Sequence, residues 1–534
     1  MTRAAMVFAL VVSTLAGCES EPEALPPFAE VEIEIDTNVD VGALATRLQI
    51  DLYDEQEGWF LSRALQQDDP RVWPTSFVLT GPKATDPGAE TKTVLVRLRL
   101  FPDGKLRDYR GDRFFPPGFL EDPSVCLPLL PPDFGERELK QLVQIAEDGS
   151  PLPPVTVPDE PQPGVTIDQF IAVKIEPGKL GKVRVTLRGE CLGVQADFGP
   201  SEAPGDESGC IDGAPLVEPF AIAVPSPTIG VAIASPTSVG TFPAPSPCTA
   251  EPRVGAFQSF EDEVCVDGRL FMLGDPAVFG DFPFDAAPER AVVVSALRID
   301  RFEVTVGRFR KALEAGQLDG LELPVSNDEP MDYGANDESL SCTFSTSPEG
   351  RDDYPLNCVS WETARGFCQR MGGDLPTEAQ WELVAAAAGR RFDTRFAWGS
   401  EEPTCERAVY ARAPSAEKGA SECAVDPADA GLLPLRENES ASGDRTPLEA
   451  VGMGGSLEEM TLDDHRPYCS ACWVGAALDD PLCSDTGAKH RSLRGGDWTR
   501  DANALLVGSR SQGIEPGSWS AKVGFRCVRK GSEP

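Results

Sequence analysis

Apolar residues occupy every second position in several stretches of the first 217 residues. The stretches are Val31–Ile35, Leu48–Leu52, Val94–Leu100, Phe170–Ile175 and Val183–Leu187. This alternation is typical of β-strands that pack one face against a core and turn the other toward water. Charged residues such as Arg184 and Arg188 fall on the second face. We therefore predict a multidomain protein that begins with an all-β sandwich over residues 28–217.

Two stretches lack the alternation. Residues 101–163 are rich in Pro, Asp and Gly, which predicts long loops or an insertion. Residues 218–247 contain seven prolines among Ser, Thr and Ala, a composition that favours extended chain over a packed core. We interpret 218–247 as a Pro-rich linker to a second domain at residues 248–530.

In the second domain the apolar residues recur at the spacing of an α-helix. A helix is predicted over 360–371, because apolar residues recur at helical intervals behind the N-cap Ser360 and Gly372-Gly373 follows. A second helix begins at the capping box Thr377-Glu378-Ala379-Gln380 and stops at Gly389. Long, turn-rich stretches separate these helices.

The first residues predict export. The apolar run Ala4–Leu15 follows Arg3 and is shorter than the roughly 20 residues that span a bilayer, and Leu15-Ala16-Gly17-Cys18 follows the pattern of a bacterial lipoprotein signal. We expect residues 1–17 to be a cleaved signal peptide, Cys18 the lipidated residue and 18–27 a tether. Glu19 is not the aspartate that retains lipoproteins at the inner membrane, which favours the outer membrane, facing the periplasm or the cell surface.

The composition of the chain bears on its binding partners and on its disulfides. The 534 residues carry a formal net charge of −38, and no Lys/Arg-rich tract offsets it, which argues against nucleic acid as a partner. Fifteen cysteines leave fourteen once Cys18 is acylated, and an exported chain favours disulfides. Cys191 and Cys210 flank an acidic loop and are expected to bridge.

Several segments resemble the formylglycine-generating enzyme family, also called sulfatase-modifying factors. The central signature is Val359-Ser360-Trp361-Glu362 followed by Gly373-Asp374-Leu375-Pro376-Thr377-Glu378-Ala379-Gln380-Trp381-Glu382. Three other segments fall in the family's order: Phe302-Glu303-Val304-Thr305, Phe396-Ala397-Trp398-Gly399, and Leu493-Arg494-Gly495-Gly496-Asp497-Trp498 leading to Gly524-Phe525-Arg526-Cys527. The resemblance covers about half of the chain.

The resemblance implies an α+β, C-type-lectin-like fold with its substrate groove near Arg494, Gly495 and Gly496. It also implies a disulfide between Cys368 and Cys527. Trp498, beside the groove segment, is the tryptophan we expect to meet a ligand. Three others are expected in the core: Trp361, Trp381 and Trp398. Arg494 itself is expected to hold the loop with its several donors.

The residues that would carry the family's copper chemistry are missing. Family members that oxidise sulfatase cysteines have two copper-binding cysteines before the final Gly-Phe-Arg-Cys, whereas residues 497–522 contain none. Cu(I) selects soft sulfur ligands, so copper is not expected here. Weak substitutes in the groove are Asp497, Arg500 and Asp501, and Glu459 is a further carboxylate.

Other metals have limited support in the sequence. His465 and His490 are the only histidines, too few for a multi-histidine iron site. Zinc at Cys469, Cys472 and Cys483 would lack a fourth ligand, and an exported chain favours disulfides. The family has a calcium-binding Gly-Asn-hydrophobic-Trp-Glu-Trp segment where this chain has Ser456 and Glu459, followed by Asp463 and Asp464, so calcium stays open.

Two functional hypotheses follow. The leading one is a non-catalytic module that binds or scaffolds an envelope protein, peptide or glycan, held at the membrane by its lipid. The alternative is a periplasmic enzyme of the same family, an oxidase or isomerase acting on a peptide or small metabolite without copper-dependent cysteine oxidation. No cofactor is identified for either.

Overall fold

The structure is a computed structural model. It describes residues 29–41, 44–54, 58–107, 160–194, 196, 209–211, 214–216, 221–222, 231–233, 237–252, 262–275, 286, 289–348, 350–390, 394–413, 423, 429–435, 443–468, 470–474, 476–485, 487–511 and 513–532. The predicted signal peptide, Cys18, the tether and most of 101–163 lie outside these residues. The described chain divides into two compact units, and the boundary in the sequence lies between Ala244 and Pro245.

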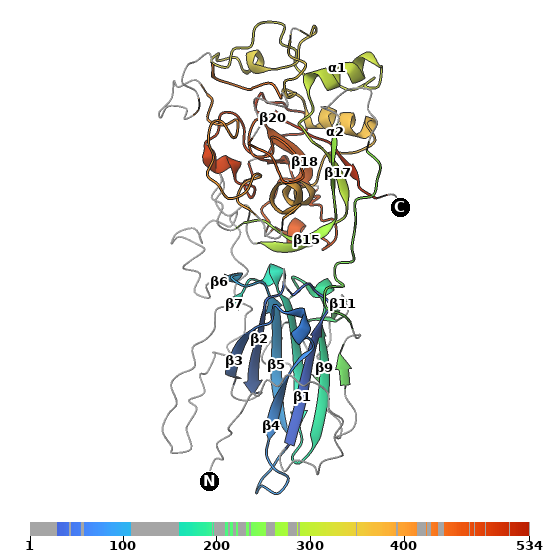
Figure 1. Ribbon diagram of the computed structural model, residues 1–534, viewed down its shortest axis with the longest axis vertical. Coiled ribbons are helices and arrows are strands. Elements are labelled where there is room, and N and C mark those ends of the chain that lie inside the picture. Colours follow the sequence, from blue (N-terminus) through green and yellow to red (C-terminus); the bar gives the residue numbers. More distant parts are fainter. Residues whose placement is uncertain are drawn as a thin grey trace. The chain divides into compact units, whose positions relative to one another are not determined.

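The first unit contains two main sheets (Figure 1). One has the order β13-β9-β1-β4, from Val231–Ile233, Leu180–Leu187, Ala29–Thr37 and Thr75–Gly81. The other has the order β12-β8-β5-β2-β3, from Ala221–Ile222, Ile167–Ile175, Lys92–Phe101, Arg47–Asp54 and Gly58–Gln66. Two smaller antiparallel pairs join β6 to β7 and β10 to β11, from Leu106–Arg107, Glu160–Pro161, Gly209–Ile211 and Ala214–Leu216. The main sheets contact one another through β8.

Strand β1 shows why the alternating sequence folds this way. Its apolar residues Val31, Ile33 and Ile35 are buried, and the glutamates between them are half-buried. Glu34 lies opposite Arg184 of β9 in the parallel register and forms an ion pair with it. The apolar face therefore forms core while the polar face is stabilised by charges across strands.

The strand predictions were incomplete. Every alternating stretch is a strand, but β3 and β4 were missed, because adjacent apolar residues such as Phe77 and Val78 obscure the alternation. The interpretation of 218–247 as a linker needs correction. Two short strands in it, β12 and β13, pair in parallel with β8 and β9, so part of this segment belongs to the first unit.

The second unit consists of small sheets and short helices. Its sheets have the orders β14-β17-β21, β15-β16 and β19-β18-β20. The strands span Glu263–Val266 (β14), Arg269–Leu273 (β15), Arg290–Val294 (β16), Leu297–Asp300 (β17), Glu458–Asp464 (β18), Arg491–Arg494 (β19), Val523–Gly524 (β20) and Val528–Lys530 (β21). Within the described residues no helix has the length and apolar character needed to cross a membrane.

The two predicted helices are confirmed at their N-termini. Helix α2 (Trp361–Arg370) is capped by Ser360, whose Oγ accepts a hydrogen bond from the N–H of Thr363. A further helix, α1 (Val306–Glu314), is capped by Thr305. Helix α3 (Glu378–Glu382) has the predicted capping box. It continues to Ala387 as a π-helical turn, a change that its sequence does not indicate. A fourth, short helix, α4, spans Ala471–Val474.

Two apolar clusters hold these elements together. Helices α1 and α2 pack through Phe309 and Phe367, whose rings stack with their centroids 5.5 Å apart. Helix α3 lies in the other cluster with Trp381 fully buried. The Cys368–Cys527 disulfide joins α2 to the segment before β21 across 159 residues. Among the described residues five further disulfides are Cys191–Cys210, Cys248–Cys265, Cys342–Cys358, Cys405–Cys423 and Cys472–Cys483.

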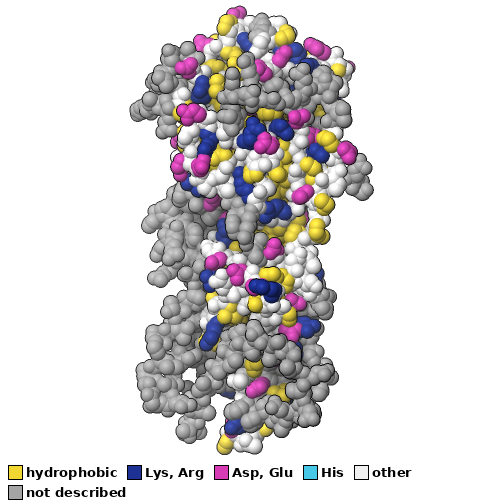
Figure 2. All heavy atoms as spheres, in the orientation of Figure 1, with side chains coloured by type: hydrophobic (Ala, Val, Ile, Leu, Met, Phe, Trp, Pro, Cys, Tyr) yellow, Lys and Arg dark blue, Asp and Glu magenta, His cyan; other side chains and the backbone are white. Residues whose placement is uncertain are grey.

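The large negative charge does not gather into one patch on the visible face. In Figure 2, acidic and basic side chains are interspersed over the residues shown in colour. Ion pairs such as Arg395 with Glu402 and Arg466 with Asp485 also bring opposite charges together among the described residues.

Candidate functional site

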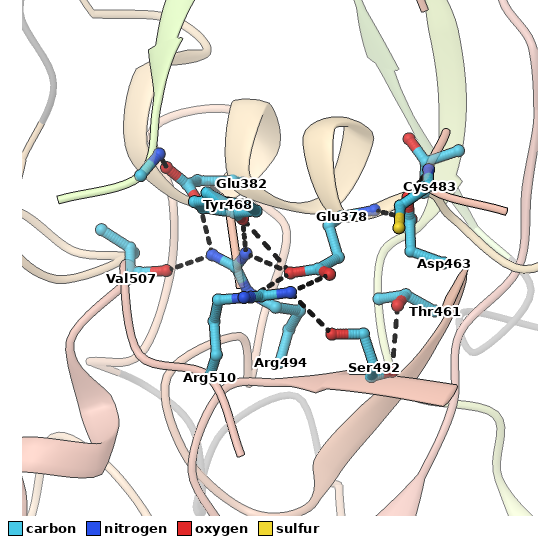
Figure 3. Close-up of polar contacts among 12 residues, drawn as sticks. Glu378, Glu382, Thr461, Asp463, Tyr468, Cys483, Ser492, Arg494, Val507 and Arg510 are labelled. Carbon is cyan, nitrogen blue, oxygen red and sulfur yellow. Dashed lines mark hydrogen bonds and ion pairs between the residues drawn. The ribbon is translucent and has the colours of Figure 1, made fainter. Parts of the chain in front are cut away.

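The signature helix α3 directs two carboxylates into the protein interior. Glu378 and Glu382 are four residues apart and therefore lie on one helical face. Both are buried, at 0% and 3% exposure. Figure 3 shows the guanidinium groups of Arg494 and Arg510 between this helix and the strand that carries Ser492. Helix α3 therefore contacts the Arg-Gly-Gly segment through ion pairs as well as through apolar packing.

The contacts around Arg494 and Arg510 form one network. Arg494 donates to Glu378 at 3.0 Å, to the hydroxyl of Tyr468 at 2.8 Å and to the carbonyl of Val507 at 2.6 Å, and also pairs with Glu382. Arg510 donates to both oxygens of Glu378 at 2.7 Å. Glu378 therefore accepts from two arginines, a strong and directional arrangement.

Burial and pairing act against each other on these acids. Burial opposes ionisation of Glu378, but the positive charges of Arg510 and Arg494 outweigh it and lower the pKa of this carboxyl to about 2. At Glu382 burial outweighs the attraction of Arg494, and the pKa is raised. Removing one partner from such a network would leave a buried charge without compensation.

A second ion pair lies next to the first network. Arg526, of the predicted Gly-Phe-Arg-Cys segment, donates to both oxygens of Glu459 at 2.6 and 2.7 Å. The indole N–H of Trp381 donates to the same carboxylate at 3.0 Å. The guanidinium of Arg494 lies over the Trp381 ring, 5.1 Å from its centroid. Trp381 therefore connects the two ion-pair networks, which we call the arginine frame: Arg494, Arg510 and Arg526 with their carboxylates.

The residues predicted to form the groove are buried. Arg494 is 0% exposed and Trp498 is 4% exposed, its ring edge-on to Tyr333 at 5.0 Å. A Cβ on Gly495 would stand 3.0 Å from the carbonyl oxygen of Met453, and the N–H of Gly496 donates to Gly454. These residues form interior packing here. Trp498 therefore presents little of its surface to a ligand in this structure.

The three weak catalytic candidates already have local structural partners. Asp497 is buried and accepts hydrogen bonds from the N–H and hydroxyl of Thr499. Burial raises the pKa of Asp497. The positive charge of Arg500 acts on Asp497 and partly offsets this effect of burial, and the N–H of Arg500 donates to the carbonyl of Asp497 at 3.1 Å. Asp501 caps the short 3-10 helix Ala502–Leu505 by accepting from the N–H of Asn503.

The predicted calcium ligands do not fit a calcium site. The carboxylate of Glu459 is taken by Arg526 and Trp381, and that of Asp463 accepts from the N–H groups of Glu378 and Cys483. Asp464 pairs with Arg491. Calcium needs six to eight oxygen ligands around one point. Among the described residues no group of three or more His, Cys, Asp or Glu is placed to hold a metal ion.

The cysteines offer no soft metal site in the described part of the chain. All twelve cysteines described are in disulfides. The predicted zinc ligands Cys472 and Cys483 are bonded to one another, and Cys469 lies outside the described residues. No described residue therefore supplies the thiolate that Cu(I) or a zinc site requires.

Two buried acids beside the arginine frame were not identified as site residues from the sequence. Asp444 accepts from the N–H groups of Gly454 and Gly455, and burial raises its pKa to about 6. Glu303 accepts from the N–H of Leu457, and burial together with the charge of Glu459 raises its pKa well above its usual range. Both carboxylates hold residues 454–457 by accepting from backbone N–H groups. Because these partners lie outside their own local segments, no local pattern in the sequence indicates either acid.

Comparison with known proteins places this site in a family. Residues 250–531, more than half of the chain, match the sulfatase-modifying factor enzyme 1-like domain. A formylglycine-generating enzyme of Streptomyces coelicolor is 28% identical over 320 residues, which cover 53% of this chain and 95% of that protein.

Two other relatives show the range of the family. A hercynine oxygenase of Mycolicibacterium smegmatis is 28% identical over 249 residues, covering 44% of this chain and 54% of that protein. A bovine (Bos taurus) protein named inactive C-alpha-formylglycine-generating enzyme 2 is 26% identical over 187 residues, covering 34% of this chain and 52% of that protein.

The arginine frame predicts a large effect of one neutral substitution. Glu378→Gln leaves Arg494 and Arg510 buried with reduced compensation, and we expect a loss of about 3–5 kcal/mol in the free energy of unfolding. The matched control is Glu362→Gln, also in the first turn of a signature helix but exposed, with an expected loss below about 1 kcal/mol. Urea titration measures both. Equal losses would contradict a structural role for the buried pair.

Proposed function

This chain belongs to the sulfatase-modifying factor family, and on that premise we propose that it is an exported lipoprotein whose second unit binds or scaffolds without catalysis. The observation that supports the proposal is that the chain keeps the arginine frame but, among the described residues, lacks free cysteine thiols that could bind copper. The arginine frame fastens the family's signature segments together, while residues 497–522 contain no cysteine and the described cysteines are all in disulfides. Copper-dependent oxidation of a cysteine lacks its ligands in this arrangement.

The proposal includes the finer architecture. The first unit is an all-β sandwich, supported by two sheets in contact through β8. The second unit is a C-type-lectin-like domain, supported by its family membership, small sheets and short helices. The ligand is an envelope protein, a peptide or a glycan. A relative named as inactive supports the idea that the family fold is used without the family reaction.

Export and lipidation rest on the first residues of the chain. The apolar run before Cys18 supports a cleaved signal, and six disulfides are compatible with an oxidising compartment. In this proposal the lipid on Cys18 anchors the protein at the outer membrane and residues 18–27 act as a tether.

A second function is favoured by the other relatives. Formylglycine-generating enzymes and a hercynine oxygenase are enzymes by name, so an oxidase or isomerase acting on a peptide or small metabolite is the alternative. Such an enzyme would need a reactive group other than the bridged cysteines. Asp497 and Asp501, which serve local turns here, would have to leave their present partners.

The assay that tests the leading proposal uses a cysteine-containing sulfatase peptide with added copper and oxygen. We expect no conversion of the thiol to an aldehyde and no oxygen consumption above that of buffer. The Streptomyces coelicolor relative serves as the positive control, because it carries the name of the activity being assayed. Turnover with one copper per chain would overturn the proposal, and turnover without copper would favour the alternative enzyme.

Lipidation has its own test. Cells expressing the full chain are labelled with a radioactive fatty acid, and we expect label on the wild type and none on Cys18→Ser. The matched control is Ser20→Ala, which lies near the predicted cleavage site but carries no acceptor thiol, so its label should remain. Absence of label from the wild type would remove the lipoprotein part of the proposal and leave the binding part standing.

A further inference from the structure

The fold brings the only two histidines of the chain together. His465 directly follows strand β18 and His490 directly precedes strand β19. Asp464 and Arg491, the adjoining residues, are partners in the antiparallel register, and the N–H of His465 donates to the carbonyl of His490 at 2.9 Å. The two histidines are therefore directly opposite each other across the strand pair.

Opposite residues in an antiparallel pair project their side chains to the same face, with Cβ atoms about 4.5–5.5 Å apart. Gly513 gives independent support for this placement. A Cβ built on Gly513 would stand 3.1 Å from the Cβ of His465 and 3.1 Å from that of His490. Both imidazoles therefore leave the backbone beside the same glycine, whose φ of +79° disfavours any larger residue.

The surroundings of the pair are accessible and electrically balanced. His490 is exposed and His465 is half-buried. The charged neighbours Asp464 and Arg491 form an ion pair at 2.5 Å, and a second pair joins Arg466 to Asp485 at 2.7 Å. A cation approaching the imidazoles thus meets mostly compensated charge, with the exposed Lys489 as the exception.

We propose that His465 and His490 bind a divalent transition-metal ion, with Cu²⁺ held most tightly. Two histidines at i and i+4 of a helix have Cβ atoms about 5–6 Å apart and bind zinc together, and the range of about 4.5–5.5 Å for opposed residues overlaps that spacing. Imidazole suits copper, nickel and zinc, and affinity in this series peaks at Cu²⁺. The site has two protein ligands, and water or a ligand from a partner completes the coordination. It is separate from the proposed function and from the arginine frame.

The test uses the untagged full-length chain titrated with CuCl₂. We expect one Cu²⁺ per chain at the tightest site, with electron paramagnetic resonance showing coupling to two imidazole nitrogens. His490→Gln and His465→Gln should each weaken this binding by at least about tenfold. Lys489→Gln is the matched control, because it changes the exposed neighbour of His490 without removing a ligand, and its affinity should not fall.

The outcomes separate a histidine site from adventitious binding. If His490→Gln and His465→Gln bind Cu²⁺ as tightly as the wild type, carboxylates of this acidic chain hold the metal and the proposal is wrong. The same conclusion follows if the wild type binds no Cu²⁺ more tightly than the double variant. Circular dichroism of each variant excludes unfolding as the cause of a loss.

Discussion

Three buried guanidinium groups determine how the second unit is built. Arg494, Arg510 and Arg526 are each 3% exposed or less, and each is paired with a glutamate of comparable burial. An unpaired charge in such a position costs several kcal/mol, so the helix and strands that supply the partners must assemble together. Because Trp381 contacts both halves of this frame, α3, β18, β19 and the C-terminal segment are fixed relative to one another.

Under the proposed function, this constraint explains how the chain can keep the family's framework without the family's chemistry. The most recognisable residues of the family segments, Trp381, Arg494 and Arg526, are structural in the present arrangement. Their retention requires only that the frame be kept. Residues 497–522, which contain no cysteine, supply Arg510 to the frame, so the frame does not depend on a thiolate in this stretch. A framework of this kind fixes the fold and does not by itself specify a reaction.

Local features were predictable from the sequence and distant partnerships were not. The caps at Ser360 and Thr377 were predicted because a cap depends on residues within one turn. Glu378 was identified only as a residue of the capping box and the family signature, because its partners lie 116 and 132 residues away. For the same reason the sequence did not indicate that Asp463, a possible calcium ligand, accepts from the N-terminus of α3, or that His465 and His490 are adjacent.

Residues 492–498 are buried in the second unit. Hydrogen–deuterium exchange of peptides spanning these residues measures this burial most directly. We expect protection as strong as that of α2, because the backbone N–H groups of Gly496 and Trp498 donate to Gly454 and Ser456. Exchange as fast as in an exposed turn such as that around Trp519 would contradict it.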